Sequence, residues 1–270
     1  MARRKSLGDQ EMSDRRVSLS PPPAILTLTE GVRASAEFVS LALFDWLLQR
    51  APRGDGHAVL VIPGFMADDR STEVLRHFLT KIGYAPYGWG LGANKGPASF
   101  DFEAEFEQLL DSILSTHGAQ VSIIGQSLGG VYAREVTKLY PQKVRQVITL
   151  GSPLRGPGGS AKHVEQMFLE VSGAKAPETS ELNIETSKNP PVPCSSIYSQ
   201  HDGVVSRQAS VQDECGQAEN IPVFASHLGM GVNPTVLFVI ADRLAQKINE
   251  WRAFEMPNDL RGLFPRQLLK

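Results

Sequence analysis

A serine set between small residues is the first feature of this chain that could do chemistry. Ser127 is the central residue of Gly-Gln-Ser-Leu-Gly at positions 125–129. The apolar run 121–124 before it predicts a buried strand, and a helical pattern begins at Leu128. A tight turn from strand to helix holds a serine hydroxyl above the edge of a sheet, where it can act as a nucleophile. The short pattern alone is common, so the hypothesis depends on the residues around it.

A serine hydroxyl is a weak nucleophile unless a base lies within hydrogen-bond reach. In sites built on this kind of turn, the acid and then the histidine follow the serine along the chain. His227 comes just after the apolar run 221–224, on a predicted loop that leaves a strand end. His201 also lies downstream, but it adjoins Asp202, and neighbouring side chains of an extended segment point apart. We therefore predict that His227 is the base.

The base in turn needs an acid that orients it. Asp202 follows the predicted strand 195–199 in a His-Asp-Gly turn, and the glycine leaves the turn free to bend. Asp213 and Glu214 are the alternatives, in a polar loop that no strand precedes. We predict that Asp202 is the acid.

The charge that develops on an attacked carbonyl oxygen needs two backbone N–H donors. The amide of Leu128, at the start of the helix after Ser127, is one candidate. The other is the amide of Phe65, in the Pro-Gly-Phe-Met turn that follows the predicted strand 57–62. A plain Pro-Gly turn is the alternative interpretation, and both can hold because the turn is what aims the amide.

The elements that must position these residues alternate along the chain. Apolar runs predict strands at 57–62, 121–124, 144–150 and 195–199, and helical patterns occur at 71–82, 128–139 and 232–254. This alternation predicts the α/β class, with a mostly parallel central sheet and helices on both faces. Ligands then bind at the carboxyl ends of the strands. Ser127, Asp202, His227 and Phe65 are all predicted at those ends, which is the strongest argument for a real site.

Five segments of the chain resemble bacterial lipases and esterases of the α/β-hydrolase superfamily. They are residues 59–65, 124–130, 149–153, 198–205 and 226–230, in the family's order and within residues 57–250. Thr-Leu-Gly-Ser-Pro at 149–153 and His-Leu-Gly at 227–229 are more specific than the turn around Ser127. Gln126 is a departure, because such lipases usually carry histidine at that position.

The resemblance implies the α/β-hydrolase fold with a small cap insertion. It also implies hydrolysis of carboxylic esters through an acyl-enzyme, a reaction of lipid metabolism, without fixing the acyl chain length. Because Gln126 is not one of the three catalytic residues, the departure implies altered tuning rather than lost activity.

Composition limits the other classes of function. The chain has 270 residues, a formal net charge of −2 and an apolar content of 41%, which suit one large domain. We see no clustered basic face for nucleic acid and no Cys/His spacing for zinc, and we expect no cofactor and no metal. The expected partner is a small-molecule or lipid ester. Cys194 and Cys215 flank the predicted acid turn, so a disulfide between them is one alternative and two unrelated cysteines the other.

The chain divides into three parts. Residues 1–30 are polar and charged and predict a mobile arm, residues 31–254 predict the folded domain, and residues 255–270 predict a tail. Within the domain, residues 155–190 break the alternation and hold one predicted helix at 162–171. We interpret this segment as a cap over the site, with a plain surface insertion as the alternative.

Residues 32–49 form a helical pattern that is apolar on most sides. Packing beside the sheet is the favoured interpretation, and contact with a membrane surface is the alternative, which would suit an enzyme that meets lipid. The basic residues 1–5 have no apolar region directly behind them, and the apolar stretch 38–44 is too short to span a bilayer. These features predict a cytoplasmic location, with membrane association as the alternative.

Other functions stay open at this stage. An acyltransferase would use the same three side chains with an alcohol in place of water. A non-catalytic binding module of the same fold would typically lack one of them, whereas Ser127, Asp202 and His227 are all present. A peptidase or amidase is a further alternative.

Overall fold

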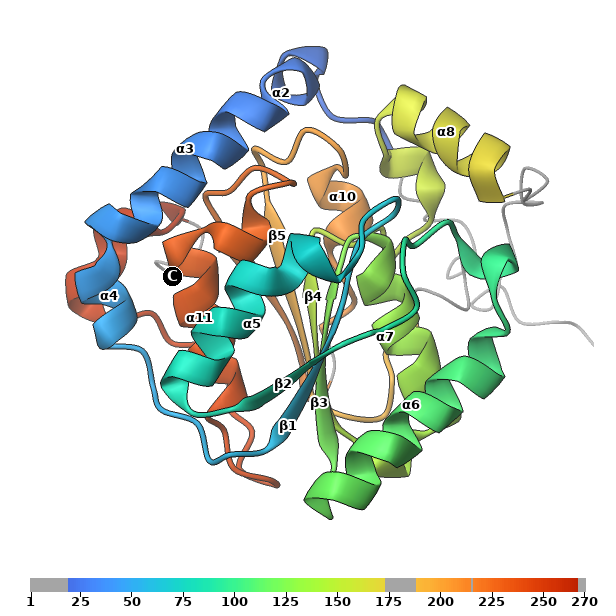
Figure 1. The fold of residues 1–270 in the computed structure, drawn as a ribbon. Helices are drawn as coiled ribbons and strands as arrows, with labels where there is room; N and C mark the ends of the chain where they lie inside the picture. Colours follow the sequence, from blue (N-terminus) through green and yellow to red (C-terminus); the bar gives the residue numbers. More distant parts are fainter. Residues whose placement is uncertain (1–18, 173–187, 215, 267–270) are drawn as a thin grey trace, which may run out of the picture.

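A computed structural model describes residues 19–172, 188–214 and 216–266 of the chain (Figure 1). In these residues, six parallel strands form one sheet in the order β2-β1-β3-β4-β5-β6. This sheet, with helices on both faces, confirms the predicted α/β class. The strands are β1 (Ala58–Ile62), β2 (Ala85–Gly88), β3 (Val121–Gln126), β4 (Val144–Leu150), β5 (Cys194–Ser199) and β6 (Ala218–Val223).

The residues of β1 show how the sequence builds two layers. All of them are buried, and successive side chains face opposite sides of the sheet. Val59 and Val61 pack in the core shared with α4 (Asp45–Gln49), α5 (Glu73–Ile82) and α11 (Pro234–Leu244). Leu60 and Ile62 pack in the core shared with α6 (Phe102–His117) and α7 (Leu128–Leu139). An uninterrupted apolar run is typical of a parallel strand covered on both faces.

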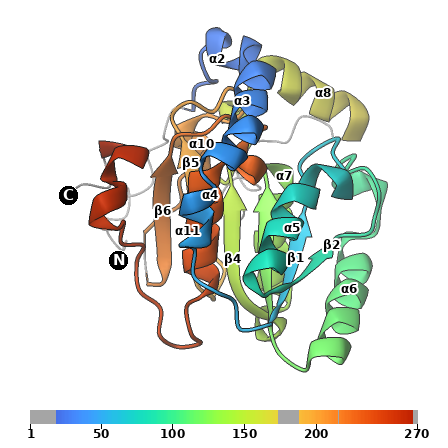
Figure 2. The same cartoon turned by 60° about the vertical axis from the view of Figure 1, so that its left-hand side comes forward.

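The remaining helices are short or peripheral. Those of α type are α2 (Ala24–Leu28), α3 (Glu30–Leu43), α8 (Lys162–Ser172) and α10 (Arg207–Ser210). Those of 3₁₀ type are η1 (Asp69–Thr72), η2 (Pro97–Ser99), η3 (Pro141–Lys143), η4 (Pro157–Gly159), η5 (Met230–Val232) and η6 (Asn258–Leu263). Helices α2, α3 and α8 lie at the end of the sheet toward which the strands point (Figures 1 and 2).

Parallel pairing carries the predicted site to that edge. Gln126 at the end of β3 is in register with Leu150 at the end of β4, and Ser199 at the end of β5 is in register with Val223 of β6. The turn after β3 and the loops after β5 and β6 therefore leave the sheet at the same edge.

The N-terminal segment differs from the predicted arm. Residues 24–30, expected to belong to a mobile arm, form α2 and the start of α3, whereas residues 1–18 lie outside the described part. The hydroxyl of Thr27 donates to the carbonyl oxygen of Gly203 at 2.6 Å, across 176 positions of sequence. The prediction missed these contacts because local polarity carries no information about so distant a partner.

Helix α3 is buried on only one side, although its sequence is apolar on most sides. Leu41 packs against the core that includes residues of α5 and α11, and so does Phe44, which lies just beyond the end of α3. Val32, Val39 and Leu43 have exposed fractions of 76, 64 and 72%. One side of residues 32–49 therefore packs on the folded domain, at α11 and the end of the sheet rather than beside the sheet as predicted, and the other side is exposed.

The closing helix is shorter than predicted. It was expected over residues 232–254, but α11 ends at Leu244, and Asn249 adopts a positive φ of 66°. The chain then turns back, because the buried Arg243 donates to the carbonyl of Arg252, and Glu219 accepts the amide of Phe254 at 2.7 Å. Long-range hydrogen bonds override the local helical pattern here.

The residues after the closing helix pack on the core. They were expected to trail as a tail from residue 255, yet Leu260 and Phe264 are 1% and 3% exposed in the core beside α11. The predicted tail therefore does not hold for residues 255–266, and residues 267–270 lie outside the described part. Among the described residues, we find no helix long and apolar enough to cross a membrane.

Candidate active site

Ser127 lies in the sharp turn between β3 and α7. Its backbone has φ 52° and ψ −122°, a strained conformation for a residue with a side chain, and its N–H donates to the carbonyl of Leu150 at 2.8 Å. A Cβ on Gly125 would lie 2.2 Å from the carbonyl oxygen of Gly129, and one on Gly129 would lie 2.4 Å from that of Ile62. The flanking glycines therefore let strand and helix approach closely enough to form the turn.

Asp202 and His227 form a hydrogen-bonded pair at the same edge of the sheet. Oδ2 of Asp202 lies 2.7 Å from Nδ1 of His227, and the two residues are 2% and 5% exposed. The other carboxylate oxygen, Oδ1, accepts the backbone amides of Val204 at 2.8 Å and Val205 at 2.7 Å. Both oxygens of Asp202 thus have partners, which fixes the carboxylate and with it the plane of the imidazole.

The environment of His227 favours its charged form. Burial by itself would lower the pKa of the imidazole, but the charge and hydrogen bond of Asp202, joined by the charge of Glu30, outweigh it and raise the pKa above the usual 6.5. A proton taken up by His227 is therefore stabilised by the carboxylate beside it.

Two contacts bring this pair close to the serine turn. Nε2 of Gln126, the residue before Ser127, donates to the carbonyl oxygen of His227 at 3.0 Å. A Cβ on Gly151, the residue after β4, would lie 2.8 Å from Oδ2 of Asp202 and 3.1 Å from Nδ1 of His227. The strand end next to β3 therefore adjoins the acid–base pair, and Gln126 ties the serine turn to the histidine.

The two predicted oxyanion donors flank the same turn. Leu128 is the first residue of α7, so its N–H has no acceptor within the helix. Phe65 follows Gly64, whose added Cβ would lie 3.2 Å from Cβ of Ser127. In the part of the chain that the structure describes, the amide of Phe65 likewise makes no hydrogen bond. Both amides are therefore available to an anion beside Ser127.

The loop that carries Phe65 is held by Asn94, which sequence analysis did not single out. Asn94 is fully buried. Its side-chain amide donates to the carbonyl of Pro63 at 3.0 Å, and its backbone carbonyl accepts the amide of Met66 at 2.7 Å. Met66 adopts a positive φ of 61°. The glycine-rich segment 90–97 around Asn94 thus supports the loop that carries Phe65.

Helix α8 of the predicted cap lies against this loop. The ring of Phe168 packs edge-on against that of Phe65, with centroids 5.3 Å apart. A Cβ on Gly96 would lie 2.7 Å from Cβ of Ser172 at the end of the helix. The first part of the insertion therefore contacts the site, and residues 173–187 lie outside the described part.

The alternatives to Asp202 and His227 have other partners. Asp213 pairs with Arg155 at 2.6 Å and is exposed, and Glu214 bonds the side chain of Asn220 at 3.1 Å. His201 is exposed, and its ring lies 5.6 Å from that of Phe224. Cys215 lies outside the described residues, so the alternative of a bridge to Cys194 stays a prediction.

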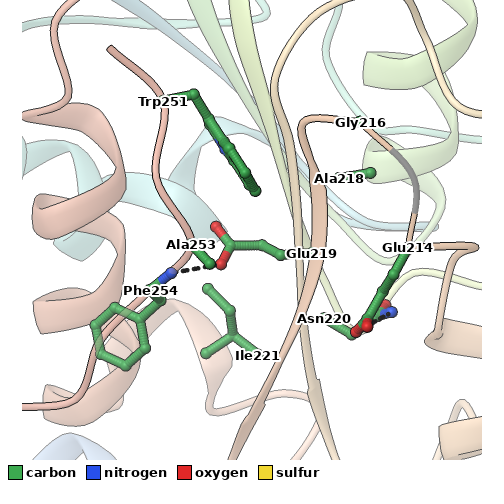
Figure 3. Close-up of a pocket in the computed structure, with 9 residues that line it drawn as sticks. All are labelled: Glu214, Gly216, Ala218, Glu219, Asn220, Ile221, Trp251, Ala253 and Phe254. Atoms are coloured by element: carbon green, nitrogen blue, oxygen red, sulfur yellow. Dashed lines mark hydrogen bonds between the residues drawn. The ribbon is translucent and has the colours of Figure 1, made fainter.

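A cavity of about 360 Å³ lies beside the amino-terminal half of β6, away from the site (Figure 3). Glu219 points into it, but its Oε1 accepts from Ser195 and Arg243, each at 2.7 Å, and its Oε2 accepts the amide of Phe254. Its carboxylate is therefore fully used within the fold. Among the described residues, no three His, Cys, Asp or Glu side chains gather as metal ligands.

Comparisons with known proteins agree on the fold. No protein-family model and no curated protein matches the chain. Similar solved structures include an α/β-hydrolase enzyme from the sediment metagenome of the Mar Chica lagoon, Morocco, with 17% identity, a TM-score of 0.50 and coverage of 70% of this chain and 90% of that one. Lipase B of Aspergillus fumigatus has 16% identity and a TM-score of 0.53, over 72% of this chain and 54% of that one.

A lipase-esterase related protein from Clostridium acetobutylicum gives the same picture. It shares 16% identity and a TM-score of 0.50, over 72% of this chain and 97% of that one. Together with the all-parallel sheet, these likenesses show that the chain has the α/β-hydrolase fold.

Proposed function

We propose that the protein is a serine hydrolase that cleaves carboxylic esters through an acyl-enzyme on Ser127, with His227 as base and Asp202 as orienting acid. The observation that carries this proposal is the buried Asp202–His227 pair, 2.7 Å apart, at the sheet edge that also holds the strained turn of Ser127. The α/β-hydrolase fold supports the general class, and the lipases and esterases among the similar structures support the ester as substrate.

The first half of the reaction acylates the enzyme. Nε2 of His227 takes the proton of Ser127 as Oγ attacks the carbonyl carbon of the ester, while Asp202 stabilises the imidazolium. The amides of Phe65 and Leu128 donate to the oxyanion of the tetrahedral intermediate. When the intermediate collapses, the imidazolium gives its proton to the leaving alcohol, and the acyl group stays on Ser127.

Water completes the cycle by the same steps in reverse. His227 takes a proton from water as the water oxygen attacks the acyl carbon, and the proton then returns to Oγ of Ser127 as the acid leaves. An alcohol in place of water would give acyl transfer, so hydrolysis in the presence of a competing alcohol separates the two outcomes by their products.

We also propose that the outer side of α3 contacts a lipid surface. Val32, Val39 and Leu43 repeat at intervals of seven and four positions, so they form one exposed stripe along the helix. Leu228 and Met66, which follow His227 and Phe65 in the chain, are also 57% and 47% exposed. An exposed apolar stripe on α3 suits an enzyme that draws an ester from a lipid layer.

The direct test of the proposed function is the hydrolysis of p-nitrophenyl esters with acyl chains of about two to sixteen carbons, by the wild type and by Ser127→Ala. We expect the wild type to hydrolyse some of these esters and the variant to lose on the order of 10⁶ in kcat. Wild-type rates in Ser127→Ala, or no hydrolysis of any ester by the wild type, would contradict the proposal. The preferred chain length distinguishes esterase from lipase.

A further inference from the structure

Two carboxylates of α3 face the loops that carry Asp202 and His227, and the reaction described above does not use them. We call residues 200–204 the acid loop and residues 224–229 the histidine loop. Glu30 and Glu37 are seven positions apart, so they project from the same side of the helix. Glu30 is 4% exposed, and burial of a carboxylate is costly unless its oxygens accept hydrogen bonds.

Glu30 joins the two loops through one side chain. Its Oε1 accepts the amide of Gly203, the residue after Asp202, at 2.7 Å. Its Oε2 accepts the amide of Leu228, the residue after His227, at 3.1 Å. A single carboxylate therefore fixes the distance between the backbone next to the acid and the backbone next to the base.

Glu37 holds the other side of the histidine loop. Its Oε1 accepts the amide of Ser226 at 2.6 Å, and its Oε2 accepts the side-chain amide of Asn233 at 3.1 Å. A Cβ on Gly229 would lie 2.2 Å from Oε2 of Glu37, so the loop closes tightly around this carboxylate. Ser226 and Leu228, the residues on either side of His227, thus both bond to carboxylates of α3.

The acid loop is held by further side chains of the same segment. Arg33 donates to the carbonyl of His201 at 2.5 Å and pairs with Glu30 at 2.7 Å. The hydroxyl of Thr27 donates to the carbonyl of Gly203 at 2.6 Å. Side chains of α2 and α3 therefore bond to both loops.

We propose that Glu30 is a positioning residue for the reaction assigned to Ser127, and that it sets the geometry of the Asp202–His227 pair by joining the two loops, with Glu37 as a second support. This inference rests on the proposed function for its kinetic consequences. Glu30 does not touch the reacting atoms, because both its oxygens bond to backbone amides.

The same residue acts on His227 through its charge. The titratable groups that face His227 are Asp202 on the acid loop and Glu30, Arg33 and Glu37 on α3. The charge of Glu30 is among the causes that raise the pKa of His227. Replacing Glu30 by glutamine removes that charge and therefore lowers the pKa of His227.

The test compares Glu30→Gln and Glu37→Gln with Glu103→Gln, a control on the exposed side of α6. Rates are divided by the number of active sites, which a fluorophosphonate titration counts. Glutamine keeps only one acceptor oxygen, so we expect Glu30→Gln to lower kcat on the order of tenfold with little change in KM. The acid limb of kcat/KM should move to lower pH in Glu30→Gln, and Glu103→Gln should match the wild type in both respects.

A purely structural role would lower the melting temperature or the number of active sites but leave kcat per site and the acid limb unchanged, and that result would overturn the proposal. A second measurement does not depend on turnover. NMR titration of the His227 ring in Ser127→Ala, with and without Glu30→Gln, should give a lower pKa when Glu30 is replaced. An unchanged ring pKa would refute the positioning role, whereas a shifted pKa in an enzyme that cleaves no ester would refute only the proposed reaction.

Discussion

Asp202 acts on His227 by charge as well as by holding its ring. In the proposed reaction the base must be neutral to take the proton of Ser127, so the raised pKa of His227 should place the rise of kcat/KM with pH above the usual 6.5 of histidine. The activity that depends on neutral His227 is thus lost as the pH falls through that raised pKa. Rates measured between about pH 5 and pH 9 should show this limb.

Asp202→Asn tests the cause of the raised pKa. The variant lacks the charge that favours the imidazolium, so the acid limb should move to lower pH and kcat should fall on the order of 10⁴-fold. Asp213→Asn, which changes an exposed carboxylate paired with Arg155, is the control and should keep the wild-type profile. An acid limb that stays in place in Asp202→Asn would show that another group titrates.

At the level of single residues, the sequence was informative where the fold imposes an order of residues along the chain. Ser127, Asp202 and His227 follow the order expected for this fold, and the structure brings the acid and the histidine together. Asn94, Glu30 and Glu37 were missed because they bond to backbone groups, and a backbone amide or carbonyl leaves no mark in the sequence. The spacing of Glu30 and Glu37 on one side of a helix was the only available signal.

The elements around the site depend on glycines that cannot be replaced without moving the backbone. In Gly125→Ala the new Cβ would lie 2.2 Å from the carbonyl oxygen of Gly129, which forces β3 and α7 apart. We expect a loss of about 3 kcal/mol in the free energy of unfolding, measured with urea. Gly31→Ala is the matched control, because nothing lies within 4 Å of its new Cβ, and it should stay within about 1 kcal/mol of the wild type. Equal stability of the two variants would contradict the packing argument.

The exposed stripe of α3 makes a prediction about lipid. The double variant Val39→Asp, Leu43→Asp should bind anionic phospholipid vesicles at least about tenfold more weakly than the wild type in co-sedimentation, because two apolar side chains no longer enter the lipid layer. Leu139→Asp changes an exposed leucine at the far end of α7 and should bind as the wild type does. Vesicle binding that is absent in the wild type, or equal in all three proteins, would contradict contact through α3.

Local pattern was a good guide to elements whose neighbours are local. The helix predicted at 128–139 and the strand predicted at 144–150 have these same bounds in α7 and β4. The closing helix was predicted ten residues too long, from its end at Leu244 to residue 254, because the hydrogen bonds that end it come from Glu219 and Arg243. Pattern alone also could not tell which side of α3 faces the protein, since both sides carry apolar side chains.

At the scale of the whole molecule, the two ends of the sheet each hold a buried histidine, and the pKa values of the two are shifted in opposite directions. His57, at the start of β1, is buried; its Nε2 lies 2.8 Å from Oγ of Ser122 and its Nδ1 contacts Asp55. Burial lowers the pKa of His57, and the positive charge of Arg145 adds to this effect against the opposing influence of Asp55. The surroundings of His57 therefore favour its neutral form, whereas those of His227 favour its charged form.

The lowered pKa of His57 predicts how stability depends on pH. Above the usual histidine pKa of 6.5, the contribution of His57 to the free energy of unfolding is fully present. It is lost as the pH falls from 6.5 toward the lowered pKa of His57 in the folded protein, because the unfolded chain then binds a proton that the folded chain does not. His227, with its raised pKa, has the opposite sign. His57→Gln should thus be less stable at pH 7 but lose less melting temperature between pH 7 and pH 5 than the wild type. The same loss in both proteins would rule out His57 as the group responsible.

Labelling with a fluorophosphonate, followed by mass spectrometry of the peptides, shows whether Ser127 is the activated nucleophile that we propose. The reagent reacts with a serine that a neighbouring base activates, in a site that stabilises the oxygen on which negative charge develops. We predict one adduct, on the peptide that contains Ser127, with labelling greatly slowed in His227→Ala. No adduct in the wild type, or an adduct on another residue, would contradict the assignment.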